Sequence, residues 1–241
     1  MLSALALVTA LVAGPAPACV ATEGGVDWGF KESFRAYLSG SIANGEWTTD
    51  GGIGYATPAF TSDELTGEVA LDTLSGRLAV DGAIRFTGHE GILDTTVSNL
   101  RLELDGQRLE LVLDVRGTTQ EFIEVDTADV LFATGDLTAA EWTAGQGGLL
   151  LSGIPLTLTE QGAEAFGTYP AGEPLDPLDL RVVTSAECAQ QAIAARDAGG
   201  GMLVPLLIVA LVLVAAVGSV LVHLRLRAAK RRVATADAQD E

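Results

Sequence analysis

An alternation of apolar and polar residues with a period of two runs through the middle of the chain and restricts the folds open to it. The apolar positions are Leu78, Val80, Gly82, Ile84 and Phe86 in one run, and Leu100, Leu102, Leu104, Leu109, Leu111, Leu113 and Val115 in the next two. Because successive side chains of a strand point to opposite faces of a sheet, this spacing predicts half-buried β-strands.

Turn residues separate these strands. Asp105-Gly106, followed by Gln107-Arg108, lies between two alternating runs and predicts a tight hairpin. Shorter apolar segments follow near residues 130–133, 149–151, 156–158 and 180–183, with breaks that contain glycine or proline. We therefore predict an all-β fold, an antiparallel two-layer β-sandwich or a flattened barrel.

Two short segments depart from the period of two. The first has apolar residues at helical spacing, namely Phe30, Phe34, Tyr37 and Leu38. Gly40 is placed to end that helix. The second, residues 159–166, has Thr159 as a candidate N-cap and Glu160 in its first turn. We expect two short helices beside the sheet.

Both ends of the chain indicate a membrane. The apolar run from Leu2 is followed by Ala16-x-Ala18, which matches a signal-peptidase site, so we predict a signal peptide over residues 1–18. The segment 202–222 contains no charged residue and, at about 1.5 Å per residue, is long enough to cross the hydrocarbon core of about 30 Å. We predict a transmembrane helix over 202–224, after a stalk over 186–201.

Charge gives the orientation of this helix. Five basic residues follow the apolar segment, namely Arg225, Arg227, Lys230, Arg231 and Arg232. Because basic flanks stay in the cytoplasm, we predict a cytoplasmic tail over 225–241 and an extracellular domain over 19–185 of a single-pass cell-membrane protein. The part before the helix holds 29 of the 32 acidic residues and nine of the 14 basic ones. So acidic a domain is not expected to bind nucleic acid or anionic lipid.

The two cysteines, Cys19 and Cys188, bracket the predicted domain. In an oxidising exterior such a pair predicts one disulfide. The alternative is lipidation of Cys19, although a lipobox prefers a larger apolar residue where Ala16 stands.

The residue types give little support to an enzyme. The segment before residue 202 holds one histidine, His89, and no recognisable nucleophile motif. A zinc site would require His or Cys clusters that the sequence lacks. Acidic residues are scattered over strand positions, so a hydrolase that uses paired carboxylates remains only a minor alternative. Taken singly, Tyr37 is typical of a core ring with its hydroxyl at the surface, and His89 of a surface turn.

Longer motifs resemble a known family. They are Val26-Asp27-Trp28-Gly29-Phe30-Lys31-Glu32-Ser33-Phe34-Arg35-x-Tyr37, Gly88-His89-x-Gly91-x-Leu93-Asp94, Ser98-Asn99-Leu100-Arg101 and Phe166-x-x-Tyr169-x-x-Gly172-x-x-Leu175-Asp176-Pro177. Together they are similar to the HtaA-type haem-binding domain of corynebacteria and related actinobacteria. The resemblance covers about residues 25–183, which is the whole predicted domain.

The resemblance implies roles for five residues. Tyr37 matches the tyrosine whose phenolate ligates ferric haem iron, and His89 matches the histidine that hydrogen-bonds this phenolate. Such a donor lowers the cost of deprotonating a phenol whose ordinary pKa is about 10. Ser33, one turn before Tyr37, is expected to meet a haem propionate. Tyr169 is expected to line the ring face, and Phe34 to support Tyr37.

These expectations combine into a membrane-anchored cell-surface protein that captures or relays ferric haem, as cargo, toward an uptake system for iron acquisition. It would perform no chemistry on the haem. The expected partners are other surface haem-binding proteins or a haem ABC importer. The alternative is an adhesive or structural β-domain of the cell envelope without a haem site.

Overall fold

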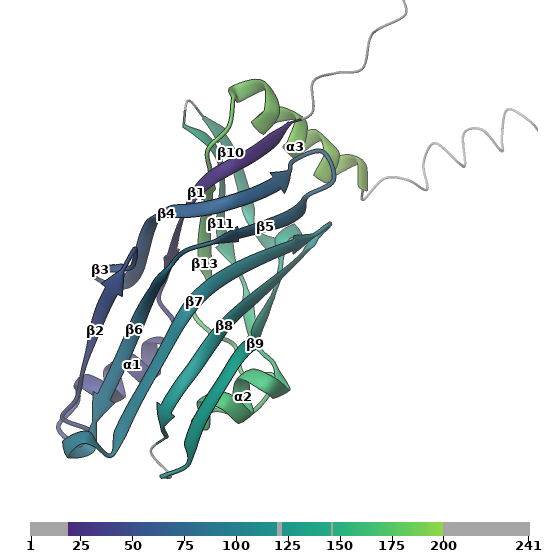
Figure 1. Cartoon of the computed structure of the whole chain (residues 1–241). Helices are drawn as coiled ribbons and strands as arrows, with labels where there is room; N and C mark the ends of the chain where they lie inside the picture. Colours follow the sequence, from purple (N-terminus) through teal and green to yellow (C-terminus); the bar gives the residue numbers. More distant parts are fainter. Residues whose placement is uncertain (1–18, 120–121, 146, 200–241) are drawn as a thin grey trace, which may run out of the picture. The chain divides into compact units, whose positions relative to one another are not determined.

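The computed structural model describes residues 19–119, 122–145 and 147–199 (Figure 1). Its strands are β1 (Val20–Trp28), β2 (Glu46–Gly51), β3 (Gly54–Ala56), β4 (Ala59–Ala70), β5 (Ser75–Ala79), β6 (Gly82–Gly88), β7 (Leu93–Asp105), β8 (Arg108–Thr118), β9 (Glu124–Asp136), β10 (Glu141–Gly145), β11 (Gly148–Ile154), β12 (Leu156–Leu158) and β13 (Leu178–Val182). Its helices are α1 (Glu32–Ser39), α2 (Glu160–Phe166) and α3 (Ala186–Gly199), with short 3-10 turns η1 (His89–Gly91) and η2 (Leu137–Ala139).

Several of the predictions concern the two ends of the chain. The signal peptide, the transmembrane helix over 202–224 and the basic tail lie outside the described residues. Within the described ranges, no helix is long and apolar enough to cross a membrane.

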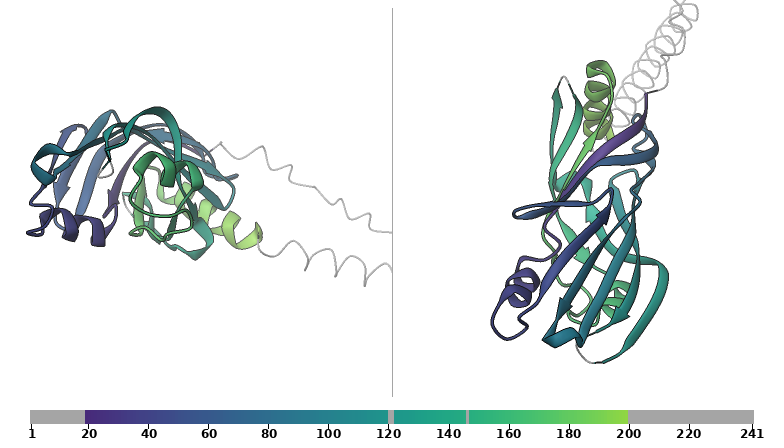
Figure 2. Two further views of the ribbon diagram at one scale, coloured as in Figure 1. Left: turned by 90° about the horizontal axis from the view of Figure 1, so that it is seen from below. Right: turned by 60° about the vertical axis from the view of Figure 1, so that its left-hand side comes forward.

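All described strands belong to one antiparallel sheet with the order β10-β11-β13-β1-β4-β5-β7-β8-β9-β12. Off this path, β3 pairs with β4, and β6 pairs with β2 and β7. The sheet curls over, and α1 and α2 lie on its concave side (Figures 1 and 2). The all-β class predicted from the period of two is therefore confirmed.

The predicted two-layer sandwich takes the form of a single curled sheet. Strand β1 explains why, because it pairs with β13 on one side and with β4 on the other. The pairing of β1 with β4 shifts register between Ala21 and Glu23 and again between Gly24 and Val26. Such bulges bend and twist a strand, so β1 joins the two halves of the sheet around a corner.

An aromatic cluster fills the end of the core beneath α1 and α2. Phe30 lies at its centre, with ring centroids 4.9 to 5.9 Å from those of five other aromatic residues, namely Trp28, Phe34, Phe86, Phe132 and Phe166. The cluster holds five of the seven phenylalanines of the chain. An aromatic-poor protein thus concentrates its large apolar rings under the two short helices, where they fix the helices to the sheet.

The two predicted helices are present. Thr159 caps α2 as expected, since its hydroxyl accepts a hydrogen bond of 2.9 Å from the Gly162 amide. Helix α1 begins at Glu32, so the inclusion of Phe30 in its face was wrong. Phe30 has a φ of +64°, outside the helical region, because the chain turns sharply there between β1 and α1.

A third helix, α3, occupies most of the segment predicted to be a stalk. Ala189 and Ala192 are fully buried, so this part of the chain packs against the domain. Cys188 in α3 is disulfide-bonded to Cys19, with a Cα–Cα distance of 5.4 Å. The sequence lacked a clear helical periodicity here because the segment is rich in alanine.

Candidate functional site

Tyr37 and His89 are in direct contact in the structure. The half-buried Tyr37 projects from α1, and its hydroxyl shares a short hydrogen bond with Nε2 of His89. The two ring centroids are 5.8 Å apart, and the ring planes meet at 47°. The structure thus contains the pairing of tyrosine and histidine that the sequence resemblance implies.

The backbone of η1 holds His89 in place. His89 and Glu90 have φ values of 51° and 58°, in the left-handed region that few non-glycine residues adopt. The His89 amide donates to the carbonyl of Ala43 at 2.7 Å, which ties η1 to the loop after α1. Gly45 lets this loop approach β6, because a Cβ there would overlap the carbonyl oxygen of Thr87. The histidine is therefore fixed relative to the helix that carries its partner.

A second hydrogen bond joins two further predicted residues. The hydroxyl oxygens of Ser33 and Tyr169 lie 2.9 Å apart. Ser33 and Tyr37 are four residues apart in α1 and so lie on the same side, about 6 Å from one another along the helix axis. Tyr169, Ser33, Tyr37 and His89 consequently form a row of polar groups along one side of α1, which we call the α1 row.

The ring of Tyr169 lies between an aromatic and a cationic neighbour. It is parallel to the ring of Phe166, with an interplanar angle of 7° and a centroid distance of 6.4 Å. Nζ of Lys31 lies 5.3 Å from the centroid of Tyr169, within the range of a cation–π contact. The sequence reasoning missed Lys31, although its position two residues before Ser33, as a rare cation in an acidic domain, was an available clue.

Phe34 lies beneath the α1 row and not on its surface. It is 1% exposed, and its ring packs against Phe30, Phe86 and Phe166 at centroid distances of 4.9 to 5.9 Å. Phe34 anchors α1 in the aromatic cluster and so supports Tyr37 from below, as the resemblance implies. Its part in binding a cofactor stays a prediction.

An ion pair joins the two strands that flank η1. Arg85 in β6 donates to both carboxylate oxygens of Asp94 in β7, from Nε at 2.7 Å and from NH2 at 2.6 Å. Hydrogen bonding from Arg85 is the main reason that the pKa of Asp94 lies below its ordinary value. This pair fastens the strand ends that carry the His89 turn.

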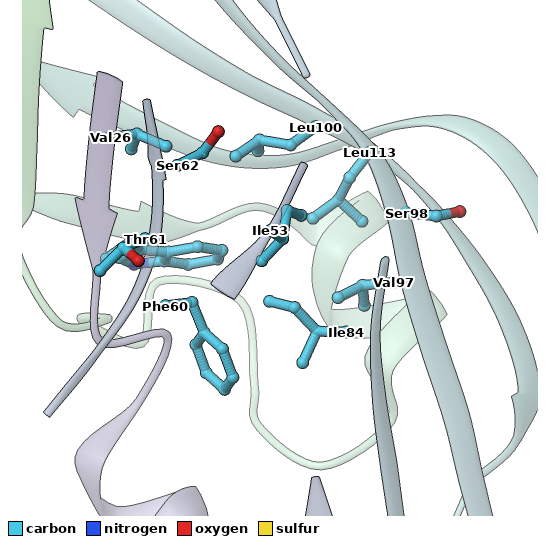
Figure 3. A pocket seen from close by; sticks show the side chains of 11 residues that line it. Val26, Ile53, Phe60, Thr61, Ser62, Ile84, Val97, Ser98, Leu100 and Leu113 are labelled. Atoms are coloured by element: carbon cyan, nitrogen blue, oxygen red, sulfur yellow. The ribbon is translucent and has the colours of Figure 1, made fainter. Parts of the chain in front are cut away.

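A cavity inside the curled sheet does not belong to this site. Its apolar lining includes Val26, Phe60, Ile84 and Leu113 (Figure 3). Its volume is about 20 Å³, which is room for about one water molecule, so a ligand the size of haem does not fit there. The α1 row at the surface remains the site where the predicted residues meet.

Comparisons with known proteins agree with the sequence motifs. A search of curated proteins found no match. The crystal structure of the C-terminal domain of HtaA from Corynebacterium glutamicum is 30% identical, with a TM-score of 0.60, and the match covers 68% of this chain and 98% of that domain. The N-terminal domain of the same protein is also 30% identical, with a TM-score of 0.55 and coverage of 68% and 99%.

A further solved structure shares the fold. The heme-binding protein HtaB from Corynebacterium glutamicum is 24% identical, with a TM-score of 0.52 and coverage of 69% of this chain and 95% of that one. The model of the HtaA family, described as Htaa, matches residues 23–181, about two thirds of the sequence. The chain therefore belongs to the HtaA family.

Proposed function

We propose that this protein binds one ferric haem as cargo, with the phenolate of Tyr37 as the iron ligand and His89 as the hydrogen-bond donor to that phenolate. The hydrogen bond between Tyr37 and His89 is the observation that carries the proposal. A phenolate is an anionic oxygen ligand that suits Fe(III). A donor within hydrogen-bond distance favours the deprotonated form, so these two residues fit the group.

Other residues of the α1 row supply contacts around the iron ligand. The exposed hydroxyl of Ser33 is placed to donate to a haem propionate, and the ring of Tyr169 to pack against the porphyrin. Lys31, whose Nζ pairs with Glu173 at 2.7 Å, lies against the ring of Tyr169 and helps to hold it in place. A propionate that accepts from Ser33 would replace the hydrogen bond that Ser33 shares with Tyr169.

The proposed role is capture or relay of haem at the cell surface. A single iron ligand from the protein, on a half-exposed helix, suits a haem that has to be released again. The protein performs no chemistry on the haem. The apolar segment 202–222 and its basic flank support a membrane anchor with the domain outside. The partners are surface haem-binding proteins or a haem importer, and the pathway is iron acquisition.

A hemin titration of the fragment 19–199 tests the proposal. We expect a Soret band distinct from that of free hemin, which saturates at one haem per chain. Tyr37→Phe should abolish most of this change because the iron loses its protein ligand. The matched control is Tyr55→Phe, since Tyr55 is also half-buried but lies outside the α1 row. A wild-type spectrum identical to that of free hemin would refute haem binding and favour the structural β-domain.

A further inference from the structure

Helix α1 does not cap its own N-terminus. Lys31 stands at the N-cap position and forms no capping hydrogen bond through its side chain. The cap comes instead from Asp176, whose Oδ1 accepts a hydrogen bond of 2.9 Å from the Glu32 amide. A helix of eight residues is only marginally stable alone, so the geometry of α1 depends on such tertiary contacts.

The same carboxylate holds a buried arginine of α1. Oδ2 of Asp176 accepts from NH2 of Arg35 at 2.9 Å, and the side chain of Arg35 is only 10% exposed. A hydroxyl contact to Tyr55 at 3.5 Å is long, and Nε of Arg35 has no hydrogen-bond partner in the described structure. Asp176 is therefore the carboxylate that compensates this buried charge.

The position of Arg35 around the helix gives this ion pair its effect on the site. At 3.6 residues per turn, Ser33 and Tyr37 lie on one flank of α1, Arg35 lies on the opposite flank, and the buried Phe34 and Leu38 lie between them. A rotation of α1 by about 20° moves an atom about 6 Å from its axis by about 2 Å. That displacement exceeds the tolerance of a hydrogen bond.

Asp176 is itself held by the start of the domain. Its amide donates to the carbonyl of Phe30 at 3.1 Å, and its carbonyl accepts from the indole of Trp28 at 3.1 Å. Gly29 makes room for the carboxylate, because a Cβ at that position would overlap it. The Asp176 side chain is thus fixed to the sheet on one side and to α1 on the other.

We propose that Asp176 is a positioning residue for the α1 row: through the Glu32 amide and Arg35 it fixes the rotation of α1, and so holds Tyr37 in contact with His89. The effect of this positioning on haem binding rests on the proposed function. The structural role itself does not, since the contact between Tyr37 and His89 involves only the protein's own residues.

The test compares Asp176→Asn with Asp27→Asn in the full chain in detergent. Asparagine keeps an oxygen acceptor for the Glu32 amide but removes the charge that balances Arg35. Asp27 is the matched control, because it pairs with Arg181 between β1 and β13 and has no hydrogen bond or ion pair with α1 in the described structure. We expect Asp176→Asn to release haem to apomyoglobin at least ten times faster than the wild type, and Asp27→Asn to match the wild type.

A measurement without haem separates this inference from the proposed function. The chain has three tyrosines, so a sample labelled with ¹³C at the tyrosine ζ carbon gives three ring signals by NMR. In ligand-free Asp176→Asn, we expect the Tyr37 signal to move to the value that it has in His89→Ala, where the partner is absent. That result would support the positioning role even if wild-type protein bound no haem.

A second variant covers the case in which Asp176→Asn does not fold. Arg35→Lys keeps the buried positive charge but replaces the planar fork that fixes the geometry of the pair. We expect the same shift of the Tyr37 signal in this variant. A wild-type Tyr37 signal and wild-type haem release in the folded variants would overturn the proposal and leave Asp176 a purely structural residue.

Discussion

Tyr37 and His89 are separated by 52 positions in the sequence, and only the fold brings them together. Residue chemistry alone favoured a core ring for Tyr37 and a surface turn for His89. The resemblance of long motifs suggested the pair, and the structure contains the contact. The hydrogen bond between Ser33 and Tyr169 and the place of Lys31 beside that ring could not be derived from the sequence, because these partners lie more than 130 positions apart.

The role of His89 can be tested by substitution. If His89 donates to the Tyr37 phenolate and does not touch the iron, His89→Ala should keep a tyrosinate-type ferric spectrum and lose haem ten to a hundred times faster. The factor corresponds to a charge-assisted hydrogen bond of about 1.5 to 3 kcal/mol. The measurement is the rate of haem transfer to apomyoglobin.

Two other results would contradict this role. A changed coordination spectrum in His89→Ala would make His89 an iron ligand. A wild-type spectrum with wild-type release would make it a surface turn residue. Thr87→Ala is the control, since Thr87 is a half-buried neighbour in β6.

At the scale of elements, local patterns predicted well and long-range pairing did not. The hairpin between β7 and β8 follows Asp105-Gly106 as expected, with Asp105 opposite Arg108 and Gly106 at a φ of +61°. The alternation with a period of two indicates which face of the sheet a side chain occupies. It does not indicate which strands pair with one another. The sequence therefore could not show that β1 joins β13 to β4, which makes one sheet out of the predicted two layers.

Asp114 in β8 supports irregular positions in both neighbouring strands. Its carboxylate accepts from the side chain of Asn99 at 2.6 Å and from the amide of Asp129 at 2.9 Å. These two residues have φ values of 54° and 56° and lie near register shifts in the pairing of β8 with β7 and β9. We expect Asp114→Asn to lower the free energy of unfolding by about 1 to 2 kcal/mol at pH 7, measured by urea denaturation.

This effect should depend on pH. Burial raises the pKa of Asp114, but hydrogen bonds from Asp129 and Asn99 and the charge of Arg101 outweigh it, so the pKa lies below its ordinary value. The stabilisation is present above the unfolded pKa of about 3.9 and is lost as the pH falls through the folded pKa. The control is Asp126→Asn, whose pair with Arg116 is exposed and should contribute less than about 0.5 kcal/mol. Equal decreases in the free energy of unfolding of both variants would contradict this account of the irregular positions.

At the scale of the whole molecule, α3 and the start of β1, which the disulfide joins, lie at the opposite end of the described domain from α1 (Figure 1). The bond joins the residue before β1 to α3 and encloses almost the entire domain, with a separation of 169 positions. The bracketing cysteines made this pairing predictable. The helix around Cys188 was not predictable, because an alanine-rich segment without apolar periodicity is typical of a linker as well.

The disulfide should affect stability but not the site. Closing so long a loop contributes about 4 kcal/mol in the chain-entropy model. The free energy of unfolding of Cys19→Ser/Cys188→Ser should therefore be lower by that amount, which a lower midpoint of urea denaturation would report. The folded double variant should bind hemin like the wild type, because α1 lies at the other end of the domain from α3 and the start of β1, which the bond joins (Figure 1). An unchanged unfolding midpoint, or diacylglycerol found on Cys19 by mass spectrometry, would contradict this prediction.

The central claim is that the oxygen of Tyr37 binds the ferric iron. Resonance Raman spectroscopy of the hemin complex, prepared with ring-deuterated tyrosine, tests it most directly because only a coordinated tyrosinate contributes enhanced modes that shift with the label. The account predicts such modes in the wild type and in Tyr169→Phe, and their absence in Tyr37→Phe. Label-sensitive modes that persist in Tyr37→Phe, or a wild-type complex without them, would contradict it.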